Sequence, residues 1–270
     1  MNNMIRRLGN AYRVASARLG HRFQPLSGGQ FGWLARREIR LGAQVLPFAY
    51  RIASEGDQGA MEQVFFNQDY RVDQWRQGRG LRKYYDAHAG ERRMLIVDAG
   101  ANIGAASVYF SAMYPHSRIV AIEPEKNNAA LARRNFEKRD IELIEAALGP
   151  EVGRMYLQDP GLSDWGFRVG TQGDYEVDVM TLEQILATRS DSVPFILKVD
   201  IEGGENDLFS RDCDWLASFP LTIIETHDWM LPGIASSKNF YRQVCRFDMD
   251  ILQKGENTFC FNNKLLRDWY

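Results

Sequence analysis

The sequence predicts an α/β fold in which a mainly parallel sheet forms the body of the chain. From residue 94 onward, short apolar runs alternate with segments of helical periodicity, the pattern of repeated β-α units. A tight glycine-containing turn follows the first apolar run, and two strand-like runs joined by a short polar turn lie near the end. These observations predict a Rossmann-like sheet with a C-terminal antiparallel hairpin, preceded by a partly helical N-terminal extension.

The composition is that of one globular domain with additions. The 270 residues are 45% apolar and 25% charged, which is ordinary for a soluble protein. The sequence contains neither the ~18 consecutive apolar residues of a membrane-spanning helix nor the apolar core of a secretion signal, so we expect a cytoplasmic protein. Its three cysteines are far apart, which favours reduced, structural thiols over a disulfide framework or a zinc knuckle.

Residues 1–60 are predicted as an Arg-rich extension. Residues 1–44 carry eight arginines against one acid, Glu38, so this segment has a charge of +7 within a chain of net charge −2. A helical spacing in it predicts an amphipathic helix, with apolar residues Ile5, Leu8, Tyr12, Ala15 and Leu19. Such a helix could dock on its own domain, mediate self-association, or rest peripherally on the inner membrane face. A nucleic-acid arm is disfavoured because the remainder is acidic, and an organelle transit peptide has a similar composition.

Two further segments precede the predicted sheet. Gly, Pro and Ser are frequent in residues 21–60, which we interpret as loops between short apolar pieces. Residues 61–92 form a lead-in, with aromatic and polar residues alternating up to Trp75, and we expect it to cover one edge of the sheet. The main domain is therefore placed at residues 93–270.

Within this domain the elements follow from the apolar pattern. The expected strands are 94–97, 118–122, 141–146, 195–199 and 221–225, and the helices between them are 103–113, 127–138, 182–187 and 205–209. Thr181 with Gln184 forms a capping box before the third helix. Strand-like pieces at 154–157 and 175–179 interrupt the alternation, and 248–252 with 258–261 form the terminal hairpin.

The strongest local signal is the run Val-Asp-Ala-Gly-Ala-Asn-Ile-Gly at residues 97–104, directly after the first strand. Gly100 permits close approach of the backbone to a ligand, Gly104 lets the helix pack near the strand, and the helix N-terminus faces the ligand. A dinucleotide-binding loop has glycine where Asp98 stands. An anion there repels a pyrophosphate but suits the ammonium and sulfonium charges of S-adenosylmethionine. A purely structural turn is the alternative.

Two more groups of acids end predicted strands. Glu123 follows Gly104 by 19 residues and precedes Pro124; its carboxylate can accept hydrogen bonds from both ribose hydroxyls, or it is a surface glutamate. The run Lys-Val-Asp-Ile-Glu-Gly-Gly-Glu at residues 198–205 ends the fourth strand. Because ligands bind beyond the carboxyl ends of such strands, Asp200 is expected where cofactor and acceptor meet. An ion pair between Lys198 and Asp200 would be a structural alternative.

Together these residues resemble the FkbM family of S-adenosylmethionine-dependent methyltransferases, over about residues 60–262. The resemblance rests on residues 98–104, Glu123-Pro124, 146–149 and, most specifically, 198–205, although Gly204 stands where the family has a bulky residue. It implies the sheet of a class I methyltransferase, and an enzyme that methylates a hydroxyl of a sugar, glycan or small-molecule intermediate. The residues expected to bind S-adenosylmethionine are Asp98, Gly100, Asn102, Gly104, Glu123 and Ala146. The Asn/Asp-Pro-Pro-aromatic sequence expected of enzymes that methylate DNA bases is absent.

O-methylation needs a base or a metal, because an alkyl hydroxyl is a poor nucleophile until its proton is removed. The candidate catalytic residues are Asp200, Glu202 and His227, the last of which follows the fifth strand. His227 titrates in a range that suits proton abstraction near neutrality, or it is a hydrogen-bonded structural residue. Asp200 and Glu225 could hold magnesium, which we do not favour because no third ligand is evident.

Trp165 in the loop 159–166 and Trp229 could stack on a sugar or ring substrate, or both could be core residues. Two other function classes remain open. A nicotinamide-dependent oxidoreductase is opposed by Asp98 and by the terminal hairpin, which most dehydrogenases lack. A non-catalytic scaffold is opposed by a loop that retains its acid and both glycines.

Overall fold

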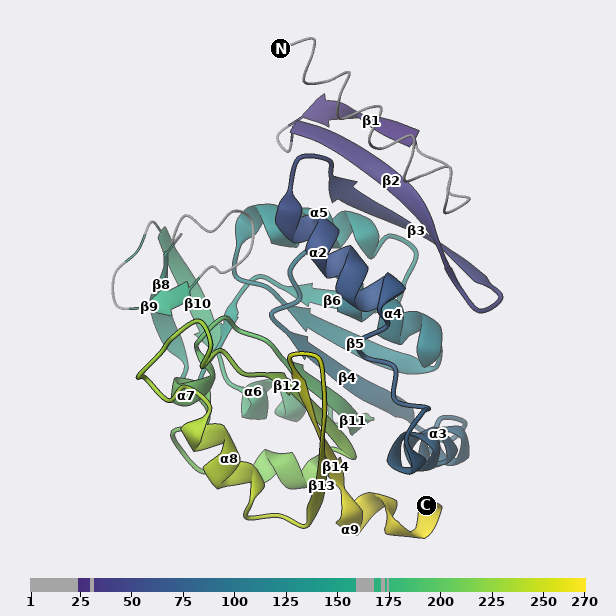
Figure 1. Ribbon diagram of the computed structural model, residues 1–270, viewed down its shortest axis with the longest axis vertical. Helices are drawn as coiled ribbons and strands as arrows, with labels where there is room; N and C mark the ends of the chain where they lie inside the picture. The colour runs from purple at the N-terminus through teal and green to yellow at the C-terminus, as the bar shows by residue number, and fades with distance from the viewer. Residues whose placement is uncertain (1–23, 30–31, 159–167, 171–172, 174) are drawn as a thin grey trace.

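The computed structural model describes residues 24–29, 32–158, 168–170, 173 and 175–270. Its centre is a seven-stranded sheet of order β13-β14-β12-β11-β4-β5-β6 (Figure 1). Neighbouring strands from β12 to β6 are parallel, whereas β14 is antiparallel to both β12 and β13. The predicted parallel sheet with a terminal antiparallel hairpin is thus confirmed. The strands are β4 (Arg93–Ala99), β5 (Ser117–Ile122), β6 (Ile141–Ile144), β11 (Ser192–Val199), β12 (Leu221–Glu225), β13 (Met249–Lys254) and β14 (Asn257–Asn262).

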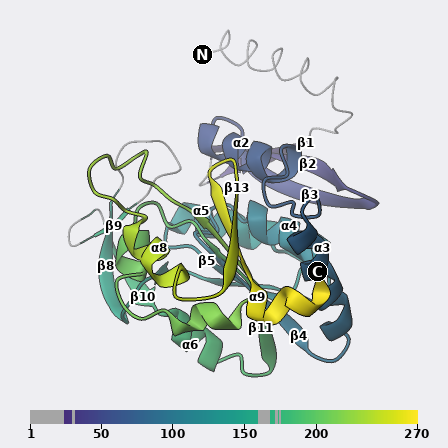
Figure 2. The same ribbon diagram turned by 60° about the horizontal axis from the view of Figure 1, so that its bottom comes forward.

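Helices cover both faces of this sheet (Figures 1 and 2). Because successive strand residues point to opposite faces, Ile96 of β4 joins one core and Val97 the other. This burial on both sides explains why the parallel strands are apolar throughout. The first face is covered by α3 (Arg76–His88), α4 (Ala105–Met113) and α5 (Lys126–Asn135), and the second by α6 (Leu182–Ala187), α7 (Glu205–Leu208), the 3-10 turn η2 (Asp214–Ser218) and α8 (Lys238–Val244). The chain ends in α9 (Asn263–Leu266) and η3 (Arg267–Trp269), beside α3.

A smaller sheet accounts for the interruption in the β-α alternation. The chain turns after β6, where the amide of Ala146 donates to the carbonyl of Ile144, so β6 ends two residues earlier than predicted. It then forms a four-stranded sheet of order β7-β10-β8-β9, built from β7 (Ala147–Leu148), β8 (Gly153–Gln158), β9 (Arg168–Gly170) and β10 (Tyr175–Met180). Thr181 and Gln184 form the predicted capping box at the start of α6.

The prediction of loops for residues 21–60 was wrong. This segment contains an antiparallel sheet of β1 (Gln24–Gly29), β2 (Gly32–Leu41) and β3 (Gln44–Arg51), followed by α2 (Glu55–Met61). In β3 the fully buried Phe48 and Tyr50 share one face, and Pro47 is exposed. Pro47 is tolerated because β3 is an edge strand, so Gly and Pro content was a poor guide here.

This N-terminal sheet packs on the main domain. The side chain of Asn135 in α5 accepts a hydrogen bond from the amide of Ala49 at 2.7 Å and donates to its carbonyl at 3.0 Å. The same Asn135 donates to the carbonyl of Ile103 at 2.9 Å. Residues of β2 and β3 therefore share their core with residues beyond 93, although the sequence placed a boundary at residue 60.

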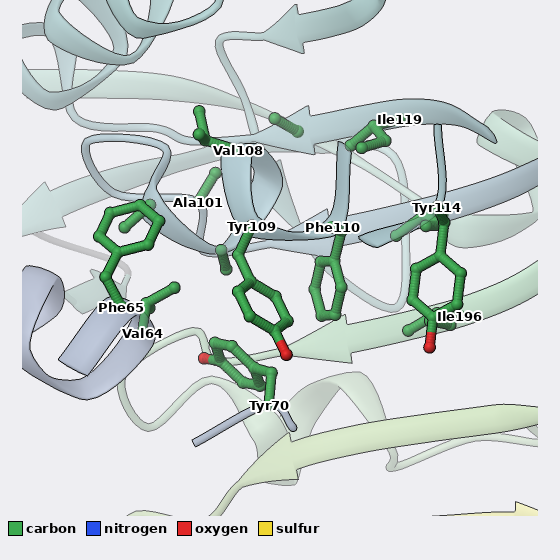
Figure 3. Packing of buried hydrophobic residues seen from close by; sticks show 14 of the residues in the cluster. Val64, Phe65, Tyr70, Ala101, Val108, Tyr109, Phe110, Tyr114, Ile119 and Ile196 are labelled. Carbon is green, nitrogen blue, oxygen red and sulfur yellow. The ribbon is translucent and has the colours of Figure 1, made fainter. Parts of the chain in front are cut away.

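The lead-in packs on a face of the sheet, where we had expected it to cover an edge. The π-helical turn η1 (Glu62–Phe66) and Tyr70 lie against α4, with the ring of Tyr70 centred 5.4 Å from that of Phe110 (Figure 3). The ring of Trp75 lies 5.1 Å from that of Phe259 in β14.

The predicted amphipathic helix in residues 5–19 and the loop with Trp165 lie outside the described residues. Over the part of the chain that the structure describes, no helix has the length and apolarity needed to cross a membrane.

Candidate functional site

A pocket of about 340 Å³ opens at the carboxyl ends of β4, β11 and β12, the edge at which open α/β sheets bind ligands. Loops from the sheet, the helix α2 and the lead-in form its walls. The lining includes Gly100, Ala101 and Asn102 after β4, Lys198, Asp200 and Glu202 at the end of β11, Glu225, His227 and Trp229 after β12, and Glu55, Gln63 and Tyr70 from the N-terminal side. The predicted catalytic residues and part of the predicted cofactor loop therefore share one pocket.

The loop after β4 is shaped by Gly100, which has a φ of +74°. A Cβ added to Gly100 would lie 1.6 Å from the carbonyl oxygen of Asp200, so the loops after β4 and β11 touch backbone to backbone. Asn102 also has a positive φ, of +50°, which asparagine tolerates better than most residues. Its Oδ1 is buried and, among the described residues, has no hydrogen-bond partner.

The structural reason for a glycine at position 104 differs from the predicted one. It is the N-cap of α4 with a φ of +87°, and an added Cβ would lie 2.4 Å from the ring of Phe136. The glycine therefore makes room for an aromatic ring at the end of α5, where we had expected it to allow packing of α4 on its own strand.

The side chain of Asp98 contacts other side chains of the protein and does not face the pocket as a free charge. Its fully buried carboxylate accepts a hydrogen bond from Ser107 Oγ at 2.6 Å and pairs with Lys198 Nζ at 3.3 Å. Lys198 donates to the carbonyl of Gly100 at 2.7 Å and pairs with Asp200 at 3.3 Å. Burial acts to lower the pKa of Lys198, but the carboxylates of Asp200 and Asp98 outweigh it and hold this pKa well above its ordinary value. The structural ion pair that the sequence left open is therefore present.

Glu123 lies just beyond the carboxyl end of β5 and is 5% exposed. Its Oε2 accepts the amide of Asn102 at 2.7 Å, and its Oε1 accepts the amide of Glu125 at 2.9 Å. Burial raises the pKa of Glu123 to about 7, against the lowering effect of these two bonds. Each carboxylate oxygen keeps a second lone pair. Ala146, the last predicted cofactor residue, lies buried just after the neighbouring strand β6.

The three predicted catalytic side chains converge. His227 Nε2 lies 3.4 Å from Glu202 Oε2 and 3.6 Å from Asp200 Oδ1. Glu225 Oε1 lies 3.7 Å from the same nitrogen. Asp200, Glu202 and His227 offer donor atoms that all lie within 4.8 Å of one another, so these three residues could hold a metal ion, a different set from the Asp200 and Glu225 considered from the sequence.

The other ring nitrogen of His227 is held by a residue whose role the sequence did not reveal. Nδ1 lies 2.9 Å from Oε1 of the fully buried Glu205, and that oxygen also accepts the amides of Ile201 and Gly203 at 3.3 Å. Gly203 has a φ of +94°, so the loop curls around the Glu205 carboxylate. Gly204, where the resemblance departs from the family, has a right-handed φ of −77° that needs no glycine.

Carboxylates set the protonation of this cluster. Burial acts to lower the pKa of His227, but its hydrogen bond to Glu205 and the charges of Glu205, Asp200 and Glu202 raise it to about 9. Burial raises the pKa of Glu202 to about 7 and that of Glu225 to about 9, with Asp200 adding to both. The carboxylates around His227 therefore favour its protonated form, whereas the sequence alone suggested an imidazole that titrates near neutrality.

Four residues that line the pocket were either left open or not predicted as site residues from the sequence. Trp229 is 57% exposed, so it is a pocket-lining surface and not a core residue. Glu55, Gln63 and Tyr70 were not predicted as site residues. Their segment carries no motif with recognisable chemistry, and only the packing of η1 on α4 places it at the pocket.

Comparison with known proteins identifies a family. A family model described as the methyltransferase FkbM domain matches residues 98–253, which is more than half of the chain. A curated protein of Beauveria bassiana, Methyltransferase 1, is 30% identical over 156 residues. That match covers 47% of this chain and 61% of the relative, so the chain spans about three fifths of the relative's length.

Solved structures with a similar arrangement include two O-methyltransferases. A putative O-methyltransferase from Klebsiella pneumoniae is 15% identical with a TM-score of 0.41, covering 69% of this chain and 79% of that one. The O-methyltransferase TomG of Streptomyces achromogenes, in complex with SAM, is 14% identical with a TM-score of 0.40, covering 76% and 87%. At these identities and scores the likeness carries no argument about substrate.

Proposed function

We propose, from the premise that this chain belongs to the FkbM methyltransferase family, that it transfers the methyl group of S-adenosylmethionine to a hydroxyl oxygen of a small acceptor. The observation that carries this proposal is the convergence of Asp200, Glu202 and His227 beside the Gly100 loop in one pocket. A methyl donor held on that loop would present its methyl group to the acidic rim, where a hydroxyl can lose its proton.

The residues present fit S-adenosylmethionine. The Oδ1 of Asn102 is buried without a partner in the described structure, so it can accept a hydrogen bond from a ligand. Gly100 leaves the loop backbone without a side chain at the pocket wall. Glu123 is buried beside the pocket and is not among its lining residues, but each of its oxygens accepts one backbone amide and keeps a second lone pair for a ribose hydroxyl; Asp98 supports the loop through Lys198.

When bound, the cofactor supplies an electrophilic methyl group on a sulfonium. The acceptor oxygen would take this methyl group, with the electron pair of the broken carbon–sulfur bond left on sulfur, so the task of this chain's own residues is to hold the hydroxyl and remove its proton. The hydroxyl proton leaves to the acidic rim of Asp200 and Glu202. The buried Glu205 fixes the orientation of the His227 ring, whose Nε2 faces these two carboxylates at 3.4 and 3.6 Å.

The walls of the pocket favour a neutral or cationic acceptor. Besides Asp200 and Glu202, the carboxylates of Glu55, Glu225 and Glu256 line it, against the two basic side chains of Lys198 and His227. An anionic chain such as a nucleic acid would be repelled. The exposed ring of Trp229 offers a stacking surface for a sugar or ring that carries the hydroxyl.

Calorimetric titration with S-adenosylhomocysteine tests cofactor binding. Micromolar binding is expected, and Glu123→Ala should lose ~1–3 kcal/mol, the scale of hydrogen bonds to a charged group. Nicotinamide dinucleotides should not bind. Absence of binding by folded protein, or binding of a nicotinamide dinucleotide instead, would refute the cofactor assignment and favour the oxidoreductase.

A panel of sugars and small alcohols with labelled cofactor then tests the reaction. With an accepted substrate, Asp200→Asn should lower turnover by ~10²–10⁴ with little change in S-adenosylhomocysteine affinity, since proton removal contributes about that factor. Mass spectrometry of the product locates the methyl group. Methyl on nitrogen, or near-normal turnover in the variant, would contradict O-directed chemistry at this rim.

A further inference from the structure

The imidazole of His227 is presented to the pocket in a fixed orientation. Its side chain is 1% exposed, and Nδ1 is held by Glu205, itself buried and anchored by two backbone amides. A carboxylate on one ring nitrogen is the arrangement that orients metal-binding histidines and leaves the other nitrogen to the ligand. Here that other nitrogen, Nε2, points to the acidic rim and makes no hydrogen bond to any described residue.

The distances around Nε2 match those between ligands of one metal ion. Its three neighbouring carboxylate oxygens, on Glu202, Asp200 and Glu225, lie at 3.4, 3.6 and 3.7 Å. Two ligands each about 2.1 Å from a common ion are about 3.0 Å apart at a right angle and about 3.4 Å apart at the tetrahedral angle. The distances from Nε2 are thus within a few tenths of an ångström of this spacing, and because the donor atoms of Asp200, Glu202 and His227 lie within 4.8 Å of one another, a small inward movement of the carboxylates would bring all three onto one ion.

An ionic lock formed by the protonated imidazole explains these distances less well. In such a lock the Nε2–H would point at one carboxylate and form a hydrogen bond of about 2.7–2.9 Å. Instead Nε2 is nearly equidistant from three oxygens, and none of them forms such a bond with it. In addition, Oδ1 of Asp200 is buried without a hydrogen-bond partner in the part of the chain described.

We propose that Asp200 Oδ1, Glu202 Oε2 and His227 Nε2 bind a divalent metal ion next to the methyl-donor loop. Glu225 lies close enough to be a fourth ligand. The mixture of carboxylate oxygens with one imidazole nitrogen suits first-row ions such as Mn²⁺ better than Mg²⁺, which prefers oxygen alone. Binding of the ion stands on this geometry; its role, to hold and acidify the acceptor hydroxyl, rests on the proposed function.

The test is calorimetry and electron paramagnetic resonance with Mn²⁺ on the full chain, treated with a chelator and dialysed beforehand. We expect one Mn²⁺ per chain. Asp200→Asn and His227→Ala should each weaken binding by more than about 100-fold, and the orienting variant Glu205→Gln by about 10–100-fold, the usual effect of such partners. Circular dichroism establishes that each variant is folded.

Glu55→Gln is the matched control, because Glu55 lines the same pocket but lies outside the three-residue cluster. Its Mn²⁺ affinity should stay within about two-fold of the wild type. Equal loss in this control and in Asp200→Asn would overturn the site, because it would mean that the ion is attracted only by the overall negative charge. Absence of saturable binding at millimolar Mn²⁺, or unchanged binding in folded His227→Ala, would also overturn it.

The two proposals fail in different ways. Methyl transfer that persists in excess chelator, by a protein that binds no Mn²⁺, refutes the ion and leaves the methyltransferase intact. Stoichiometric Mn²⁺ binding by a protein that does not bind S-adenosylhomocysteine supports the ion site and refutes the cofactor assignment.

Discussion

Replacing Gly100 by alanine should destabilise the protein far more than the same change at Gly42. Both glycines have a positive φ, +74° and +58°, so both pay the strain of a left-handed alanine. At Gly42, in the turn between β2 and β3, nothing lies within 4 Å of an added Cβ. At Gly100 the added Cβ would lie 1.6 Å from the carbonyl oxygen of Asp200. The pair therefore separates backbone strain from the contact between the two loops.

The size of the difference follows from these contacts. A left-handed alanine costs about 1–2 kcal/mol, reduced by about 0.4–1 kcal/mol through the stiffer unfolded chain, which leaves about 1 kcal/mol at Gly42. At Gly100 the loops must also separate by more than 1 Å, because real Cβ contacts essentially never fall below 3.0 Å. Overpacking adds about 1–3 kcal/mol, and the charged hydrogen bond from Lys198 to the Gly100 carbonyl about 1.5–3 kcal/mol if it breaks.

Urea unfolding at equilibrium measures both variants, with calorimetry against S-adenosylhomocysteine as a second readout. Gly42→Ala should lose about 1 kcal/mol and keep cofactor affinity. Gly100→Ala should lose about 3.5–7 kcal/mol if the hydrogen bond from Lys198 breaks, a large part of the total stability of a typical domain, and lose affinity as well. Equal losses of stability in the two variants would show that the loops after β4 and β11 do not touch as described, which would contradict this wall of the pocket.

Three other predictions address the N-terminal sheet, the cofactor acid and the loop after β11. Asn135→Ala should cost about 2–4 kcal/mol in urea unfolding, because the buried amide and carbonyl of Ala49 lose their partner; a loss below 1 kcal/mol would mean that the N-terminal sheet is not docked. Affinity for S-adenosylhomocysteine should rise as pH increases through about 7, the raised pKa of Glu123, because only the ionised carboxylate is a strong acceptor; a profile unchanged by Glu123→Ala would contradict this. Gly203→Ala should destabilise the protein by more than about 1 kcal/mol and Gly204→Ala by less, because only Gly203 has a left-handed φ, while an added Cβ at Gly204 would lie 3.2 Å from Ile201 Cδ1; the reverse order in thermal unfolding would refute the loop conformation.

The parallel sheet could be predicted because its strands are buried on both faces and therefore read as continuous apolar runs. The N-terminal sheet could not, since the Gly, Pro and Ser residues at 25–29 and 54–59 favoured loops there, and residues 45–50 stood out as no more than a short apolar piece. Only the tertiary contact with Asn135 shows that β3 belongs to the main body. The position of the lead-in was missed for the same reason. Its aromatic residues predict burial, but the sequence does not show which part of the domain they pack against.

Part of the candidate site could be predicted from the sequence and part could not. Asp200 and His227 could be placed together because parallel strands present their carboxyl ends at one edge, a consequence of topology alone. The link between His227 and Glu205 depends on the curl of the loop around Gly203, a conformation that the sequence does not encode in a recognisable motif. The hydrogen bond to Glu205 also contributes to the raised pKa of His227, so the sequence could name the residue but not what surrounds its ring.

The carboxylate of Asp98 makes a different contact from the one expected of its motif. The sequence assigned its charge to direct attraction of the cofactor, yet the carboxylate is fully buried and paired with Lys198. Lys198 in turn donates to the Gly100 carbonyl and faces Asp200, so one buried cation ties the cofactor loop to the acidic rim. Loss of Asp98 would therefore leave a buried ammonium short of one partner and disturb both loops together. The acid of the loop is needed for the geometry of the pocket even before any charge on the cofactor is considered.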